Sequence, residues 1–359
     1  MRDPGFHSLV VVKSRTGQLD ALCRSRAHDW AGVQPLVEVL HNVGGPVVMD
    51  RLADAIWVLG GFGRPVMLDV SQLHPSSALW EHPGGPYQYL IDELDRRRTL
   101  GSTDVGFVPV VCTKDTRERQ TAVGNVLEHL GLGAGVRVPR ALASSDALAE
   151  VREAVAVLGA DPSQVDVVLD AEYVANPVRQ ATVRILRGQL RRKGWRRFRS
   201  VTVLSGSIPP RRAKEDRDQE RPEFLLWLNT SCGKWLRYGD YGVVHPVAPS
   251  PGGPGRRPRH PFLHYTLPQR SLFRTRRLPH RDLTGDREAQ FQQEYFAEIA
   301  ADVLDRHGGE VESWGDRALQ RCVRGEIGFH EPDDWIAIAL SHHIAHLATR
   351  ADLVAEDRR

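Results

Sequence analysis

The chain has 359 residues, of which 41% are hydrophobic and 26% charged, and its formal net charge at pH 7 is +3. These proportions predict a globular protein with a sizeable core and exclude a disordered chain. No apolar run approaches the ~18 residues of a membrane span, and the N-terminus lacks a signal-peptide pattern, so we expect a cytoplasmic protein without membrane contact.

Short apolar, β-branched runs alternate with helical patterns, which is typical of repeated βα units and a parallel sheet. Eight runs are predicted as strands, at residues 8–15, 33–40, 64–73, 106–113, 135–139, 165–174, 198–208 and 235–246. Seven helical patterns lie between them, and this count fits a TIM-like (β/α)8 barrel better than an open sheet. Asn176 is predicted to cap the sixth helix, with Pro177 at its first position.

The character of the chain changes after the eighth run. We expect a barrel over residues 1–248, a loop rich in Pro, Gly and Arg over 249–261, and a C-terminal β-hairpin with helices packed on the barrel over 262–359. The hairpin is predicted around Pro268 and Gln269, and the last helix after Pro332. The predicted fold class is therefore α/β, a single barrel with a C-terminal hairpin and helical extension.

Polar residues at the C-terminal ends of the predicted strands are the candidate site, because barrel enzymes place their active sites there. Alternate residues of a strand share a face, so these side chains are expected to converge on one mouth. A buried mouth of mixed charge is costly unless its charges pair or bind something. The candidate catalytic residues are Lys13, Glu38, Asp69, Asp170 and Asp240.

Further polar residues near the same strand ends are candidates for ligand binding. Residues 205–210 (SGSIPP) resemble a small phosphate-binding turn after the seventh strand, where barrels often hold phosphate. The candidate ligand-binding residues are Arg15, Arg137, Ser205, Gly206, Tyr241, His342 and His343.

Three hypotheses follow for the mouth. In the first, the carboxylates hold a divalent cation such as Mg²⁺, Lys13 and Arg137 bind a phosphate, and the reaction is hydrolysis of a phosphate ester. In the second, no metal is present and Lys13 acts as a base or Schiff-base amine with Glu38 or Asp170 as its partner. In the third, the charges form a structural ion-pair network. The sequence leaves open whether the chain is an enzyme, which metal it would use, and its oligomeric state.

The histidines of SHHIAH (341–346) could ligate a metal, since His342 and His346 lie four residues apart on one helical face. The metalloprotease pattern also needs a Glu beside the first histidine, and Ile344 and Ala345 do not provide it. A helix-cap contact, or a link from the last helix to the barrel mouth, is the alternative.

Basic residues are concentrated in two stretches. Residues 187–199 contain seven Arg or Lys, and the stretch from Arg256 to Arg281 contains eight Arg, both without an acid. In the first stretch Trp195 and Phe198 lie between arginines, a composition seen at nucleic-acid surfaces, although cations also favour a helix C-terminus. The second stretch is the better candidate for a nucleic-acid or protein partner. The four cysteines form no CxxC pair, which favours reduced thiols.

Several segments together resemble a known family. They are VVVKSRTGQLDAL, PLVEVL, PYQYLIDELD, FVPVV, VDVVLD, SVTVLSGSIP, LRYGDYGVVHP, SWGD and SHHIAHLATR. On these segments, which span about residues 8 to 350, the chain resembles the Beta protein family of phages and bacteria. The resemblance implies a barrel-like layout and a phage-related or defence-associated role, and it transfers no reaction. Our preferred expectation is a barrel that binds an anionic, phosphate-bearing ligand at its mouth. The alternative is a non-catalytic interaction protein that acts through its basic segments.

Overall fold

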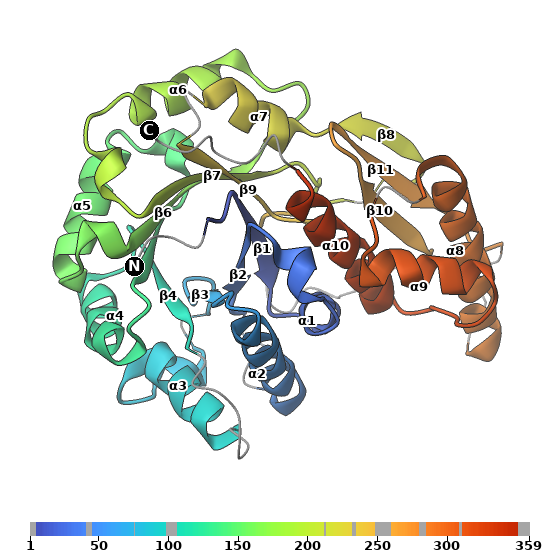
Figure 1. Ribbon diagram of the computed structural model, residues 1–359, viewed down its shortest axis with the longest axis horizontal. Coiled ribbons are helices and arrows are strands. Elements are labelled where there is room, and N and C mark those ends of the chain that lie inside the picture. Colours follow the sequence, from blue (N-terminus) through green and yellow to red (C-terminus); the bar gives the residue numbers. More distant parts are fainter. Residues whose placement is uncertain are drawn as a thin grey trace.

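The computed structural model describes residues 5–40, 45–74, 76–97, 106–211, 213–231, 235–247, 260–279, 285–308 and 311–350. Within these ranges eight parallel strands close into a barrel, and the predicted (β/α)8 type of fold is confirmed. Figure 1 shows the barrel surrounded by helices, with a smaller sheet beside it. The barrel strands, in spatial order, are β1 (Ser8–Lys13), β2 (Val33–Glu38), β3 (Met67–Asp69), β4 (Val108–Cys112), β5 (Ala134–Val138), β6 (Val165–Tyr173), β7 (Ser200–Gly206) and β9 (Leu236–Asp240).

One α-helix lies in each connection between successive barrel strands. These helices are α1 (Thr16–Cys23), α2 (Pro46–Gly61), α3 (Gly85–Arg97), α4 (Arg117–Leu130), α5 (Ala147–Leu158), α6 (Gln180–Leu190) and α7 (Pro222–Thr230). Short 3-10 helices lie at Ala27–Trp30, Ala78–Trp80, Ala141–Ala143, Pro162–Gln164 and Trp195–Arg197. The predicted start of the sixth helix is wrong, because Asn176 and Pro177 precede it and Arg179, in an extended conformation, is the cap residue.

Apolar strands form the barrel because both of their faces are buried. In β1, Leu9 and Val11 point into the barrel, where they belong to a small interior cluster, while Val10 and Val12 point outward into the layer between strands and helices. This alternation continues to Lys13, the last residue of β1, which is again an inward position. The interior is therefore apolar at depth and becomes polar where the strands end.

A second, antiparallel sheet lies beside the barrel in the order β10, β11, β8. Its strands are β8 (Arg217–Glu220), β10 (Phe262–Thr266) and β11 (Arg270–Thr275), and β10 with β11 forms the predicted hairpin. The eight predicted strands do not include β8. The sequence RDQE has no apolar alternation because β8 is an exposed edge strand, which forms by backbone pairing with β11.

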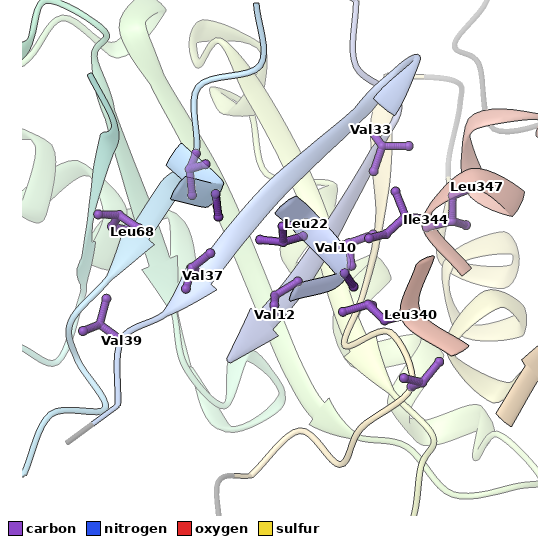
Figure 2. Packing of buried hydrophobic residues seen from close by; sticks show 14 of the residues in the cluster. Val10, Val12, Leu22, Val33, Val37, Val39, Leu68, Leu340, Ile344 and Leu347 are labelled. Atoms are coloured by element: carbon purple, nitrogen blue, oxygen red, sulfur yellow. The ribbon is translucent and has the colours of Figure 1, made fainter. Parts of the chain in front are cut away.

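The helices after the hairpin are α8 (Asp286–His307), α9 (Trp314–Val323) and α10 (Pro332–Ala348). α10 packs on the outside of the barrel next to β1: Figure 2 shows Leu340 and Ile344 beside Val10. A Cβ atom at Gly17 of α1 would lie 2.3 Å from the carbonyl oxygen of Asp333, so the two helices are in close contact.

The second sheet and the helices α8 to α10 are here called the C-terminal unit. The barrel and the C-terminal unit share elements across the expected boundary at residue 248. β8 precedes the boundary but belongs to the second sheet, and α10 follows it but takes the place of an eighth helix around the barrel. No helix in the described part of the chain is long and apolar enough to cross a membrane.

Candidate functional site

Six of the predicted site residues meet at the C-terminal mouth of the barrel, and their side chains form one connected group. The strand register places Lys13, Glu38 and Asp69 side by side on three neighbouring strands. All six residues are at most 3% exposed. This mouth network consists of Lys13, Glu38, Asp69, Arg137, Asp170 and Tyr241.

Arg137, the inward-facing cation of β5, lies at the centre of the mouth network. Its Nε and Nη2 atoms lie 3.0 Å and 2.6 Å from Oδ2 of Asp170. Its Nη1 atom lies 2.6 Å from Oδ2 of Asp69 and 2.8 Å from Oε1 of Glu38. Nη2 also donates to the hydroxyl oxygen of Tyr241 at 2.5 Å. One guanidinium group thus binds three carboxylates from three strands, which a planar group with five donors is suited to do.

Lys13 occupies the other side of the network. Its Nζ atom lies 2.6 Å from Oε2 of Glu38 and donates a second hydrogen bond, also 2.6 Å, to the carbonyl oxygen of Pro246. The Tyr241 hydroxyl donates to Oδ2 of Asp170 at 2.7 Å. Glu38 therefore bridges the two cations, and the mouth network is closed on itself.

The mouth network carries more negative than positive charge. Two cations against three carboxylates give a formal charge of −1 when all of them are ionised. Burial by itself would raise the pKa of Glu38, but Lys13 and Arg137 outweigh it and hold that pKa below its ordinary value of 4.5. Burial would lower the pKa of Arg137, but Tyr241 and the surrounding carboxylates raise it well above the usual value. Both cations are thus engaged by groups of the protein itself.

Asp240 does not lie in the mouth, and our placement of it there is wrong. Neighbouring residues of a strand point to opposite faces, so Asp240 and Tyr241 cannot both enter the barrel, and Tyr241 takes the inward position. Asp240 points outward, where its Oδ2 accepts hydrogen bonds from Arg221 at 3.1 Å and from the Tyr238 hydroxyl at 2.5 Å. Its Oδ1 lies 2.9 Å from Nε2 of His343.

The two adjacent histidines of α10 hold that helix to the rest of the protein. Nδ1 of His343 lies 2.9 Å from Oγ1 of Thr266, so this ring bridges β9 and β10. Nδ1 of His342 lies 2.9 Å from Oδ1 of Asp316, and its Nε2 lies 2.8 Å from the carbonyl oxygen of Thr266. Both rings are buried away from the mouth network. This geometry fits a link from the last helix to the barrel rather than metal ligation, since His343 contacts Asp240 at the end of β9.

The remaining candidate residues have different surroundings. Arg15 follows β1 and is exposed. Ser205 pairs in register with Asp240 on the outer face of the barrel, and within the described residues its buried hydroxyl has no hydrogen-bond partner. Gly206, the last residue of β7, lies against residues that line the mouth. A Cβ atom there would be 2.7 Å from the Pro246 side chain and 3.1 Å from the Tyr241 side chain. The structure therefore places Ser205 outside the mouth and Gly206 where a larger residue would not fit.

Two residues outside the candidate list lie near the mouth network, Arg140 and Glu172. Arg140 follows β5 and Glu172 is the last residue but one of β6, and their φ angles are 50° and 55°. No other described residue except glycine has a positive φ. Nε of Arg140 lies 3.4 Å from Oε1 of Glu172, and the Arg140 side chain is 78% exposed. Backbone strain of this kind costs about 1–3 kcal/mol per residue and is concentrated at functional sites. No pattern of residue types would have identified it.

The described residues contain no group of three His, Cys, Asp or Glu side chains that could hold a metal ion. In the mouth, the Arg137 guanidinium occupies the space between the carboxylates that a divalent cation would need. The described cysteines add no metal ligand to this conclusion. Cys112 is buried, which raises the pKa of its thiol, and Cys232 lies outside the described residues. The predicted divalent cation therefore gains no support from the geometry.

The two basic stretches differ in how far they are engaged within the fold. In the first, most of the Arg and Lys side chains are exposed, but its aromatic residues are not. Trp195 and Phe198 are buried, so they form no stacking surface for bases. In the second stretch, Arg274 lies 2.6 Å from Asp218 and 3.1 Å from Asp302. Residues 256–259, 280 and 281, which include Arg256 and Arg281, lie outside the described residues. The described part of this stretch thus contributes to the C-terminal unit rather than presenting a continuous basic surface.

Comparison with known proteins gives one result. A family model described as Beta protein matches residues 10–349, from within β1 to the end of α10. No curated protein matches the chain. The match thus includes the barrel, the second sheet and the helix that joins them.

Proposed function

The chain belongs to the Beta protein family, and we propose that its barrel mouth binds a small anionic, phosphate-bearing ligand through the rim above the mouth network. The observation that carries the proposal is the pair of exposed cations at the strand ends. Arg15 follows β1, and Arg140 follows β5 with a strained backbone. Such cations bind phosphate oxygens by charge-assisted hydrogen bonds.

The charge of the mouth network determines where the anion binds. Because the network has a formal charge of −1 and its cations are paired, a phosphate inside it would meet uncompensated carboxylates. The exposed cations at the rim, Arg15 and Arg140, are not surrounded by carboxylates in this way. Among the described residues, Arg140 forms one long contact of 3.4 Å, to a partly exposed Glu172, and exposed pairs of this kind are worth about 0–1 kcal/mol. A ligand phosphate can therefore replace that partner at little cost.

An aromatic side chain at the same rim suits the organic part of such a ligand. Tyr173, at the end of β6, is 40% exposed, and its ring centroid lies 5.5 Å from that of His245. Amphipathic rings at the edge of a polar site provide contact area for a sugar or a base. The proposal is limited to binding and includes no metal-assisted hydrolysis, because Arg137 fills the space between the carboxylates.

A thermal-shift screen tests the proposal. The probes are inorganic phosphate, ribose 5-phosphate and glycerol 3-phosphate at millimolar concentration, with ribose and glycerol as uncharged counterparts. We expect at least one phosphate ester to raise the melting temperature by about 2–5 °C and its uncharged counterpart to leave it unchanged.

A matched pair of variants locates the binding site. Arg15→Gln combined with Arg140→Gln removes two exposed cations at the mouth, and we expect the shift to disappear. Arg196→Gln combined with Arg197→Gln removes two exposed cations before β7, at the opposite end of the barrel, and we expect the shift to persist. If no phosphate ester shifts the melting temperature, or if both double variants behave alike, the proposal is wrong.

A further inference from the structure

A surface pocket of about 550 Å³ lies far from the mouth network, between the end of α1 and the outer face of α9. Its volume falls within the roughly 300–1,000 Å³ typical of small-molecule sites. We call it the arginine pocket, and its main lining residues are Arg24, Trp314, Arg317, Arg321, Ile327 and Phe329. None of these residues belongs to the mouth network, so the inference does not rest on the proposed function.

The pocket combines cations with apolar surface. Arg317 and Arg321 lie one turn apart on α9, and residues four apart on a helix lie on the same face. Ile327 and Phe329 follow α9 and supply aliphatic and aromatic surface. The Arg24 guanidinium lies over the Trp314 ring, 4.6 Å from its centroid, and this stacking fixes the orientation of a third cation.

The arginines of the pocket have capacity for a further acceptor. Arg317 lies 3.8 Å from a Glu312 side chain that is 77% exposed, and such a surface contact contributes little. The partner of Arg321 is shared, because Glu326 also binds Arg324. A guanidinium group has five N–H donors, so single or shared carboxylates leave several of them for a ligand.

From this combination we infer that the arginine pocket binds a nucleoside monophosphate, a ligand that joins one phosphate to a planar base. Arg317 and Arg321 bind the phosphate, and the base lies against Ile327 and Phe329. A mononucleotide suits both the size of the pocket and its division into a cationic and an apolar side. An anion without a ring would leave the apolar side in water, and a neutral ring would leave the remaining N–H donors of the arginines in water.

Isothermal titration calorimetry on the full chain tests this inference with the 5′-monophosphates of adenosine, guanosine, cytidine and uridine. We expect at least one of them to bind with a Kd below about 1 mM. Its nucleoside and ribose 5-phosphate, titrated against the Arg15→Gln, Arg140→Gln variant so that the mouth does not contribute, are each expected to bind at least about tenfold more weakly than the nucleotide, because each lacks one half of the ligand.

Variants distinguish this pocket from other sites. Arg317→Gln combined with Arg321→Gln is expected to weaken binding at least about tenfold. Arg306→Gln, which removes an exposed arginine of α8 outside the pocket lining, should leave binding unchanged. The Arg15→Gln, Arg140→Gln variant should also retain it, which separates this pocket from the mouth. In the Arg15→Gln, Arg140→Gln background, the inference is overturned if none of the four nucleotides binds with a Kd below about 1 mM, if ribose 5-phosphate binds as tightly as the nucleotide, or if adding the α9 double substitution leaves binding unchanged.

Discussion

Replacement of Arg137 by Met tests whether the mouth network is held together as the structure indicates. Arg137 is 3% exposed and binds the carboxylates of Glu38, Asp69 and Asp170. Met fills much of the same space but carries no charge, so the formal charge of the network falls from 2 − 3 = −1 to 1 − 3 = −2. Removing one partner of a buried ion pair costs about 3–5 kcal/mol, and we expect a loss of unfolding free energy in that range at pH 7.

The same variant has an expected pH dependence. In the wild type, the pKa of Glu38 lies below its ordinary value of 4.5, so its carboxylate stabilises the fold above pH 4.5. That contribution is lost as the pH falls through the lowered pKa. In Arg137→Met the Glu38 carboxylate loses one of its two cations, its pKa rises, and its protonation at acidic pH relieves part of the repulsion. The difference in stability between wild type and variant should therefore be largest near pH 7 and decrease toward pH 4.

Urea unfolding, followed by circular dichroism at several pH values, measures these differences. The triple variant Arg137→Met, Asp69→Asn, Asp170→Asn leaves Lys13 and Glu38 as a neutral pair and should recover much of the lost stability. Two outcomes would refute the reasoning. One is an Arg137→Met protein within about 1 kcal/mol of the wild type, and the other is a triple variant less stable than the single one.

Three further predictions concern buried residues and close packing around the barrel. Burial and nearby cations lower the pKa of His346 to about 2, so this side chain stays neutral in the fold, whereas in the unfolded chain it takes up a proton below pH 6.5. The wild type therefore loses stability on acidification that His346→Gln does not lose. Relative to wild type, the unfolding free energy of His346→Gln, measured by urea unfolding, should increase by about 2 kcal/mol between pH 8 and pH 5. Gly17→Ala should cost about 1–3 kcal/mol, because its Cβ would lie 2.3 Å from a carbonyl oxygen of α10. Gly188→Ala, in an open position of α6, should instead stabilise by about 0.5–1 kcal/mol, and equal effects of the two glycine variants on the melting temperature would contradict the packing argument. Asp240→Asn should lower stability by about 1–3 kcal/mol, because it removes one of the two carboxylates that bind the buried Arg221 and leaves Glu223 as its partner, and unchanged resistance to limited proteolysis would argue against this role.

The sequence alone determined the barrel and most of the mouth. Strands buried on both faces need continuous apolar runs, so each strand can be recognised from its own residues. A polar residue that ends such a run lies at the barrel mouth by topology, which is why Lys13, Glu38, Asp69, Arg137 and Asp170 could be named from their positions. Those positions could not predict which charges pair, or that Arg137 lies at the centre, because both depend on side-chain geometry.

Only the tertiary structure decided the direction of Asp240, the pairing of β8 and the position of α10. A strand can be shifted by one residue without any change in composition, and that shift exchanges the inward and outward faces. β8 gave no signal because an edge strand forms through backbone hydrogen bonds to a partner about 50 residues away in sequence. α10 is apolar on most of its surface, so its sequence showed that it is buried but not what it packs against, and its contact with β1 arises only when the chain folds.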